Sequence, residues 1–502
     1  MPGLAELLTW ITGRSPPAST DPWASNPWSL ERPLLHFSRG DGWTIGDACG
    51  GTQIFGDPGS GKTTGSGQAI ALAMLRAGFG GLVLTVKSSE TDRWRRYMEI
   101  ARRPEEDLIV FSPEGPHRFN FLEYERTRAS RGGGRTANIA ELFVTLANSG
   151  DGAASAGHRD AYWDRALRQL LRNIIDTLRI AQEPITLERM HRVVTSAPLS
   201  AEESDDEHWQ RGSYLFELLA TANERPLSDP DRRDLAVTTQ FWLTEFAGVL
   251  DPKTRGNIVS TFTTMADGFM RGDLRELFCT ALTITPEATF EGKVIVLDLP
   301  ERQFHELGRL AQVIWKHCWQ RSVEASGRGA ASRPVFLWVD EAQNFITPDE
   351  PRFVQTAREH KACCVYLTQS RANYLHALGS QHAAAVESFL GVPKTKIFHC
   401  NGDPETNRWA ERVIADGWKS RFSNTTTEPD RQPGRQGPRN SRTLVRQREP
   451  RVHAADFGTL RCGGPPGFTV QAILFQSGRC FIGGEGNIAR LTFHQNPEHP
   501  RR

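Results

Sequence analysis

The sequence predicts an α/β fold in which a mainly parallel central sheet is interrupted by an inserted all-helical domain. A glycine-rich loop at 56–62 stands between an apolar strand and a helix. Short apolar runs of strand length occur on both sides of residues 135–275, and that middle segment repeats apolar residues every three or four positions. Strands alternating with helices are typical of a doubly wound parallel sheet.

The strands are expected from both halves of the chain. In the first half, a strand ends at Phe55, a helix closes at Gly78, and apolar runs follow at 80–90 and 107–113. In the second half, the buried strands are predicted at 293–300, 334–343 and 363–370. Residues 468–486 are expected to form a pair of strands that closes one edge of the sheet.

The composition favours a cytoplasmic protein. The net charge of +1 excludes a wholly basic surface but leaves local basic patches open. The eight cysteines form no CxxC pair, so we expect reduced thiols. No apolar run approaches the ~20 residues that span a bilayer. Residues 3–13 are expected to form an amphipathic packing helix or a helix that contacts a membrane surface or a partner.

The glycine-rich loop has the spacing of a phosphate-binding P-loop. The stretch GDPGSGKT fits GxxxxGK[ST] in full, between a strand and a helix N-terminus whose dipole favours anions. Lys62 is expected to reach the β- and γ-phosphates of a nucleoside triphosphate, and Thr63 to ligate magnesium. The nucleotide-binding residues are predicted to be Gly56, Asp57, Pro58, Gly59, Ser60, Gly61, Lys62, Thr63 and Thr64.

Two later strands end in polar residues that complete a hydrolytic site. Asp340 and Glu341 follow the apolar part of the strand predicted at 334–343, and Gln369 lies at the end of the strand predicted at 363–370. Because ligands bind at the carboxyl ends of parallel strands, we expect all three beside the P-loop. Asp340 is predicted to hold magnesium, Glu341 to deprotonate the attacking water, and Gln369 to sense the γ-phosphate.

The spacing of these residues narrows the class of enzyme. Lys62 and Asp340 are 278 residues apart, although both are expected at one edge of one sheet. A few strand–helix units account for only part of these 278 residues, so the remaining residues must form an inserted domain. A compact kinase or GTPase has little room for such an insertion, whereas a motor acting on a large partner does.

The order of the motifs resembles the FtsK/HerA group of ring-forming, DNA-pumping ATPases. These motifs are GDPGSGKT, VDEAQNF and YLTQS, with a helical insertion between the first two. Further stretches resemble the TraG/TraD-like coupling proteins of conjugation and type IV secretion: RFNFLE, ANIAELF, YWDRALRQLLRNII, TRGNIVSTFTTMADGFMRGDLRELF and FHCNGDPETNRWAERVI. The resemblance covers about residues 45–495.

The resemblance implies a RecA-like P-loop ATPase that uses ATP and Mg²⁺, assembles as a homo-hexamer and translocates DNA. A relaxase or a secretion-channel protein is an implied partner. The family usually opens with transmembrane helices, and this sequence has none, so we expect a cytoplasmic location with any attachment to the inner membrane made through a partner.

The combined patterns divide the chain into six expected segments. The segment 420–452 carries seven arginines from Arg431 to Arg451 and almost no apolar residues, so we expect a flexible insertion that has no match in the family. The expected segments are 1–45 (irregular lead-in), 46–125 (ATPase core, first part), 126–275 (helical domain), 276–419 (ATPase core, second part), 420–452 (arginine-rich insertion) and 453–502 (closing strands and tail).

The resemblance also implies an arginine finger that completes a neighbouring subunit's site. In the family an arginine precedes the glutamine strand, and here Arg358 lies eleven residues before Gln369. A guanidinium at that place stabilises charge that develops on the γ-phosphoryl group. Arg371 is the alternative residue for this role.

Three basic segments are candidates for contact with DNA phosphates. These are 91–97, where Trp94 and Tyr97 accompany arginines, the pair Arg271 and Arg275, and the tract from Arg431 to Arg451. Two other functions remain open at this point. One is a soluble HerA-like ATPase working with a nuclease or a defence effector, and the other is an ATP-gated receptor that binds a protein substrate without pumping DNA.

Overall fold

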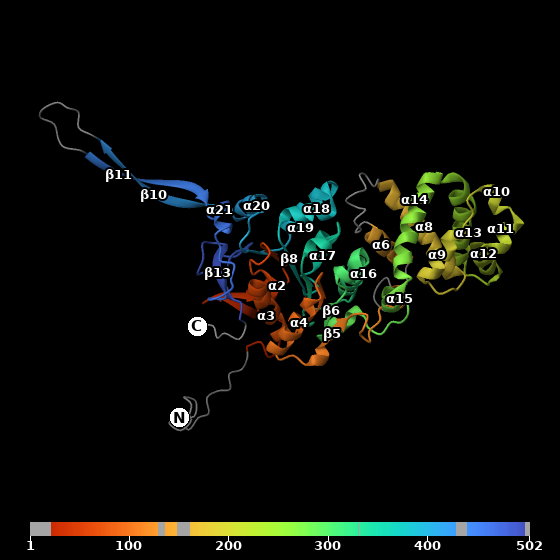
Figure 1. Ribbon diagram of the computed structural model, residues 1–502, viewed down its shortest axis with the longest axis horizontal. Helices are drawn as coiled ribbons and strands as arrows, with labels where there is room; N and C mark the ends of the chain where they lie inside the picture. Colours follow the sequence, from red (N-terminus) through yellow and green to blue (C-terminus); the bar gives the residue numbers. More distant parts are fainter. Residues whose placement is uncertain (1–21, 129–135, 148–160, 330, 428–438, 497–502) are drawn as a thin grey trace, which may run out of the picture.

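The computed structural model describes residues 22–128, 136–147, 161–329, 331–427 and 439–496. The molecule is elongated: a central sheet covered by helices lies between a helical lobe at one end and a projecting two-stranded hairpin at the other (Figure 1). No helix among these residues is long and apolar enough to cross a membrane. The predicted N-terminal helix at 3–13 lies outside the described residues.

A nine-stranded sheet forms the centre of the molecule, in the order β13-β12-β9-β3-β8-β7-β4-β6-β5. From β9 to β5 all neighbouring strands are parallel, and β12 and β13 add an antiparallel edge. The strands are β3 (Thr52–Phe55), β4 (Gly80–Leu84), β5 (Leu108–Phe111), β6 (Val294–Leu297), β7 (Val335–Val339), β8 (Ala362–Thr368), β9 (Thr395–Phe398), β12 (Thr469–Gln476) and β13 (Ile488–His494). The predicted α/β fold with a mainly parallel sheet is confirmed.

Helices cover both faces of the sheet because its inner strands are apolar on both sides. Residues Phe336 and Trp338 pack with α3 and α4, whereas Leu337 and Val339 face the core shared with α16 and α17. Trp94 of α4 stacks on Phe336 with ring centroids 5.6 Å apart. The covering helices are α2 (Ile45–Ala48), α3 (Gln68–Arg76), α4 (Ser89–Ile100), α16 (Glu301–Ala325, interrupted at His305), α17 (Glu350–Thr356), α18 (Arg371–Leu378), α19 (Ala383–Gly391) and α20 (Pro404–Ile414).

A buried ion pair fixes the segment that follows β7. Lys316 of α16 pairs with Glu350, and its ammonium group also donates to the carbonyl oxygen of Phe345 at 2.6 Å. The Glu350 carboxylate accepts from Tyr366 at 2.7 Å and from Gln320 at 3.0 Å. Removing one partner of such a pair leaves an uncompensated buried charge, which costs roughly 3–5 kcal/mol. The network therefore holds residues 342–350 against the sheet.

The middle of the chain is helical throughout its described part, as the apolar periodicity predicts. The lobe at the end of the molecule lies beside α16 and is drawn from yellow-orange to green in Figure 1. We retain 126–275 as the proposed extent of this inserted domain. Its elements are α6 (Thr136–Ala147), α8 (Ala161–Ile180), α9 (Leu187–Thr195), α10 (Ala201–Ser204), α11 (Glu207–Gly212), α12 (Tyr214–Glu224), α13 (Asp229–Gln240), the π-helical segment Phe241–Val249, α14 (Pro252–Phe269) and α15 (Gly272–Phe278), preceded by α5 (Phe121–Thr127).

Two segments expected to be irregular contain paired strands. In the lead-in, β1 (Pro33–Ser38) pairs with β2 (Asp41–Thr44). In the arginine-rich segment, β10 (Asp416–Thr427) pairs with β11 (Arg439–Pro450) in an antiparallel register without slips. Hydrogen bonds between the strands and cross-strand side-chain pairs form this ribbon without an apolar core. A prediction based on apolar content therefore does not detect it. The closing strand pair is found as expected, but β13 begins at Ile488, beyond the predicted range.

Candidate nucleotide-binding site

The P-loop leaves the carboxyl end of β3 and turns into α3 through a π-helical turn at Thr63–Gly67. Gly59 and Gly61 have φ values of 76° and 83°, in the left-handed region that glycine adopts at no steric cost. A Cβ at Gly61 would also collide with Val470 of β12. The loop therefore needs glycine for both its backbone conformation and its close approach to the edge strand.

Hydrogen bonds hold this loop against the segment that follows β9. The Asp57 N–H donates to the Cys400 carbonyl at 2.9 Å, and the Asp57 carboxylate accepts from the Gly402 N–H at 2.7 Å. Below the loop, the Ser66 hydroxyl lies 2.7 Å from Nε2 of His399. Burial lowers the pKa of His399 to about 3, so this imidazole is neutral. These contacts hold the loop in its curled conformation.

Glu341 lies at the centre of the candidate site. Its carboxylate is 3.9 Å from the ammonium groups of both Lys62 and Lys87, and it accepts from Gln369 at 3.3 Å and from Gln343 at 3.0 Å. Glu341 itself has φ 48° and ψ 54°, a left-handed conformation uncommon for a side chain of this size. The structure thus brings together Lys62, Glu341 and Gln369, as the sequence predicts.

Asp340 is a buried carboxylate close to other negative charges. It follows β7 directly, and its Oδ1 accepts from the Glu341 N–H at 3.1 Å. Burial and the neighbouring charges of Glu90 and Glu341 together raise the pKa of Asp340 to about 6, against the opposing effect of Lys62 and Lys87. A cation at this place would relieve the repulsion between the carboxylates.

The donor set fits magnesium better than a metal held entirely by protein. No group of three or more His, Cys, Asp or Glu side chains arranged to hold a metal is found among the residues that the structure describes. Mg²⁺ usually takes one or two protein ligands and completes its shell with phosphate oxygens and water. Thr63 and Asp340 would suffice for such a site.

Three residues of the site were missed by sequence analysis. Lys87 and Glu90 follow the carboxyl end of β4, and Gln343 lies two residues beyond Glu341 and accepts from Thr368 at 2.9 Å. The rule that placed Asp340 at the sheet edge applies equally to the polar residues after β4. Their segment contains no recognisable motif that marks them.

The end of the described chain also contacts the P-loop. Gln495 donates to the Thr64 hydroxyl at 2.8 Å and accepts from the Gly464 N–H at 2.7 Å. This contact joins residues that are 431 positions apart in the chain. It places the segment after β13 beside the first turn of the helix that carries Thr63.

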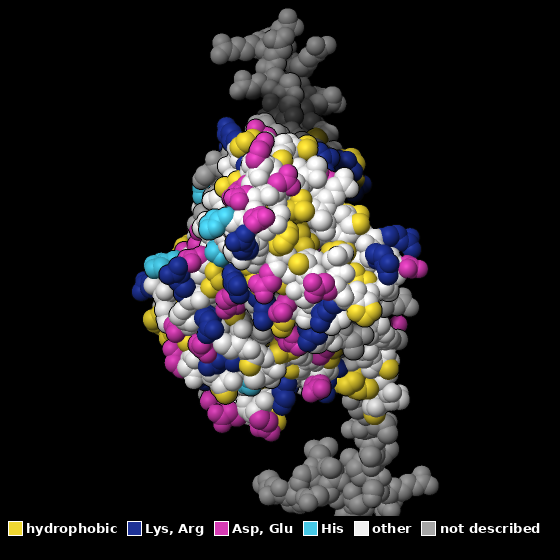
Figure 2. Space-filling view, turned by 90° about the vertical axis from the view of Figure 1, so that its right-hand side faces the viewer, with side chains coloured by type: hydrophobic (Ala, Val, Ile, Leu, Met, Phe, Trp, Pro, Cys, Tyr) yellow, Lys and Arg dark blue, Asp and Glu magenta, His cyan; other side chains and the backbone are white. Residues whose placement is uncertain are grey.

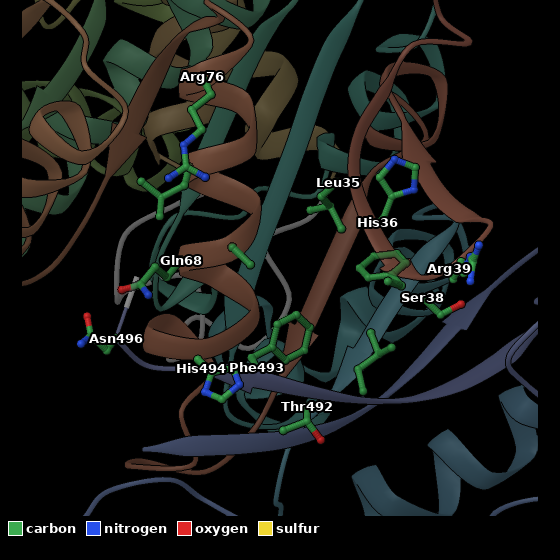
Figure 3. Close-up of a pocket in the computed structure, with 14 residues that line it drawn as sticks. Leu35, His36, Ser38, Arg39, Gln68, Arg76, Thr492, Phe493, His494 and Asn496 are labelled. Carbon is green, nitrogen blue, oxygen red and sulfur yellow. The ribbon is translucent and has the colours of Figure 1, made fainter. Parts of the chain in front are cut away.

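Two cavities flank α3 next to this contact. One of about 610 Å³ lies between β1, α3 and β13; Figure 3 shows Gln68 and Asn496 at one side of it and His36 and Arg39 at the other. The second, of about 630 Å³, lies towards α4 and shares Gln68 and Asn496 with the first. Neither is lined by Lys62 or Glu341, so the triphosphate position follows from the loop and not from a cavity.

Comparison with solved structures shows which fold this is. A "bacterial conjugative coupling protein", TrwBdeltaN70 in its unbound form, superposes with a TM-score of 0.58 at 13% identity, covering 93% of this chain and 88% of that one. TrwB in complex with ADP and Mg²⁺ gives 0.56 at 14% identity, with coverage of 93% and 90%. TrwB with the GTP analogue GDPNP gives 0.52 at 14% identity, with coverage of 94% and 92%.

The chain has the TrwB fold. At these identities the likeness establishes the fold, and the nucleotides named belong to the TrwB structures. No family model matches the chain, and no curated protein matches its sequence. The match to TrwB covers the central sheet and the helical lobe together, since more than nine tenths of this chain is superposed.

The structure places the two arginine-finger candidates at opposite ends of the parallel strands. Arg358 is exposed in the turn between α17 and β8, at the amino end of β8, whereas Gln369 follows the carboxyl end of the same strand. Arg358 therefore does not join the site of its own chain. Arg371 begins α18 at the carboxyl edge, and its side chain donates to Glu387 at 2.8 Å.

The structure places the aromatic residues of one basic segment in the core, and it pairs an arginine of each of two segments with a carboxylate. Trp94 and Tyr97 are buried in the core, so they are not free to stack on bases, and Arg95 of the same helix pairs with Asp92. Arg271 pairs with Asp267. Figure 2 shows cationic and anionic side chains interspersed over the end of the helical lobe. The prediction of a DNA-binding surface at 91–97 is wrong with respect to its aromatic residues.

The buried Asp340 predicts a pH dependence of stability in nucleotide- and magnesium-free protein. Its folded-state pKa of about 6 is above the ordinary value of 3.8, so the folded chain keeps a proton that the unfolded chain has lost between these two values. The free energy of unfolding should therefore fall as pH rises through this window. Asp340→Asn should remove this loss and be more stable than the natural chain at about pH 7.5, by on the order of 1–3 kcal/mol.

The measurement is chemical denaturation of both proteins at about pH 4.5 and 7.5. Glu405→Gln, at an exposed position of α20, is the control for a general effect of removing a carboxylate. A stability difference between the Asn variant and the natural chain that is the same at both pH values would contradict the assignment.

Proposed function

We propose that this protein is an ATP- and magnesium-dependent ring motor that translocates DNA, of the coupling-protein type. The observation that carries the proposal is the position of Glu341, which lies between Lys62, Lys87 and Gln369 at the sheet edge beside the P-loop. TrwB structures with the same fold contain ADP with Mg²⁺ or a non-hydrolysable ATP analogue, which supports ATP as the nucleotide here.

The geometry supports hydrolysis over transfer to another acceptor. Lys62 and Lys87 would neutralise the triphosphate, while the Glu341 carboxylate, oriented by two amide donors, would accept a proton from water. Magnesium, held by Thr63 and Asp340, would supply charge neutralisation at the β- and γ-phosphates. Gln369 contacts both Glu341 and, through its carbonyl, Asn401 at 2.8 Å, so it links the catalytic carboxylate to the segment before α20.

A ring of subunits would give a role to Arg358, which does not contact the nucleotide site of its own chain. Arg358 is exposed at the edge of the sheet opposite the P-loop, so it can complete a site only in a neighbouring copy. We therefore propose a homo-hexamer in which Arg358 acts in trans, with Arg371 as the alternative. DNA is the proposed substrate, and a relaxase or a secretion-channel protein is the proposed partner, with any membrane attachment made through that partner.

Glu341→Gln should bind ATP but hydrolyse it at least roughly a hundredfold more slowly, because the amide cannot accept the proton of the attacking water. Lys62→Ala should instead lose nucleotide affinity. Steady-state ATPase assays and binding of a fluorescent ATP analogue separate the two effects. Glu405→Gln serves as the matched control, and unchanged turnover in Glu341→Gln would refute its role as the base.

Arg358→Ala should lower ATP hydrolysis, and mixing it with Lys62→Ala subunits should restore part of the activity. In mixed rings, an intact P-loop of the first variant lies beside an intact Arg358 of the second. The rate is measured across mixing ratios at constant total protein. The absence of any recovery, together with recovery when Arg371→Ala replaces Arg358→Ala, would move the finger to Arg371.

DNA should stimulate ATP hydrolysis at low salt, and native mass measurement should show six protomers under the same conditions. Phosphate contacts make both binding and stimulation decrease with salt. ATPase rates are compared with single-stranded DNA, with duplex DNA and without DNA. A flat rate across all three would favour the ATP-gated receptor over a DNA motor.

A further inference from the structure

The hairpin formed by β10 and β11 projects away from the body of the molecule (Figure 1). Its two strands pair with each other in a separate sheet and do not join the central one. A two-stranded ribbon alone in water is only marginally stable. A partner that covers one of its faces would therefore stabilise it.

The register of the ribbon sorts its side chains onto two different faces, because successive residues point to opposite sides of a strand. Trp418 lies opposite Arg448, Phe422 opposite Leu444, and Asn424 opposite Arg442. We call this side the aromatic face: Trp418, Ser420, Phe422, Asn424, Arg442, Leu444, Arg446 and Arg448. The other side, the mixed face, carries Lys419, Arg421, Ser423, Thr443, Val445, Gln447 and Glu449.

The aromatic face exposes large rings beside arginines. Trp418 is 64% exposed and Phe422 is 57% exposed, whereas the tryptophans of the core are buried. The Arg442 guanidinium lies 3.7 Å from the centre of the Phe422 ring, and that of Arg448 lies 5.6 Å from the centre of Trp418. Between Trp418 and Asn424, and on the paired residues of β11, this face carries no carboxylate.

The mixed face has a different charge balance. Glu449 accepts from Arg421 at 3.0 Å and lies 3.9 Å from the ammonium group of Lys419, so one carboxylate partly neutralises both cations. Even with Asp416 at the root of β10 counted on the aromatic side, its three arginines leave that side with more positive charge than the mixed face, in a chain whose net charge is only +1. A polyanion with flat apolar groups is complementary to that face.

The root of the ribbon is anchored close to the nucleotide site. Arg451 donates to Asn487 at 2.9 Å and to the Ile414 carbonyl at 2.7 Å, which fixes the end of β11 to α20 and to the closing strands. At its other end, α20 follows Gly402, whose N–H is bound by Asp57 of the P-loop. One helix therefore separates the P-loop from the ribbon.

We propose that the aromatic face of this ribbon binds single-stranded nucleic acid. Arg442, Arg446 and Arg448 contact phosphates, and Trp418 and Phe422 stack on bases. The two rings are four residues apart on one strand, about 13 Å, which is far more than the 3.4 Å between stacked bases of a duplex. They would therefore contact bases of an extended strand. The inference rests on the proposed action on DNA and adds the element that contacts it.

The test compares two charge-matched variants of the full-length chain. Arg446→Gln with Arg448→Gln removes two cations from the aromatic face, and Lys419→Gln with Arg421→Gln removes two from the mixed face. A third variant, Trp418→Leu with Phe422→Leu, removes both rings and keeps the charge. Binding of a fluorescein-labelled single-stranded oligonucleotide and of its duplex is followed by anisotropy without nucleotide, across a salt series.

The aromatic-face charge variant should bind the single strand roughly tenfold more weakly, with a salt slope smaller by about 1.4, as expected for two lost phosphate contacts. The leucine variant should also lose roughly tenfold or more, with an unchanged slope. The mixed-face variant should change the affinity less than about threefold. The natural chain should prefer the single strand to the duplex.

Equal losses in both charge variants, or an equal preference for duplex, would overturn the assignment to the aromatic face. Unchanged DNA binding in all variants would overturn it too, and a concurrent drop in oligomer mass would assign the face to a contact between copies. In both cases the proposed DNA motor would stand if DNA still stimulated hydrolysis. A natural chain that neither binds DNA nor responds to it would instead refute the proposed function itself.

Discussion

The parallel register of β3, β8, β7 and β4 is the constraint on which the candidate site depends. Phe55 pairs with Thr368, Val339 with Tyr366, and Leu84 with Val339, so these strands end at a common edge. Whatever follows each strand must emerge there, since parallel strands share one direction. This is why Lys62, Lys87, Glu341 and Gln369 converge, although a helical domain separates the first two from the others in the chain. Insertion of that domain between β5 and β6 leaves the edge intact.

Two kinds of buried charge serve different purposes in this protein. Lys316 and Glu350 form a pair whose remaining bonding capacity is met by Phe345, Tyr366 and Gln320, so the pair is satisfied by the fold alone. Asp340 is equally buried but close to further carboxylates, and its pKa is raised as a result. A carboxylate kept in such surroundings is costly unless a ligand compensates it, which is typical of functional sites. The structural ion pair and the candidate ligand site thus contain the same type of residue, a buried carboxylate. They differ in whether the surrounding groups satisfy its charge.

The neighbours of each charged side chain also decide the charge balance of the surface. On α4, Arg93 and Arg95 pair with carboxylates one turn away, and Arg271, just beyond α14, pairs with Asp267, so much of the positive charge in these basic stretches is balanced locally. On the β10–β11 ribbon the period of two places Glu449 with Lys419 and Arg421 and leaves Arg442, Arg446 and Arg448 on the other face. Arginines in the helices thus lie beside carboxylates, whereas those of the ribbon gather on one face, because the period of the backbone decides which charges are neighbours.

The sequence by itself determined the α/β fold, the P-loop, the strand-end residues Asp340, Glu341 and Gln369, and the helical middle, because these depend on local patterns of apolar, glycine and acidic residues. It did not reveal Lys87, Glu90, Gln343 or Gln495, which belong to the site only through the folding of distant segments onto one edge. It also predicted a flexible segment where a paired ribbon forms, since cross-strand pairing has no apolar signal in a polar tract. Only the tertiary structure decided that Trp94 is core while Trp418 is exposed. Burial depends on what packs against a residue and not on its neighbours in the chain.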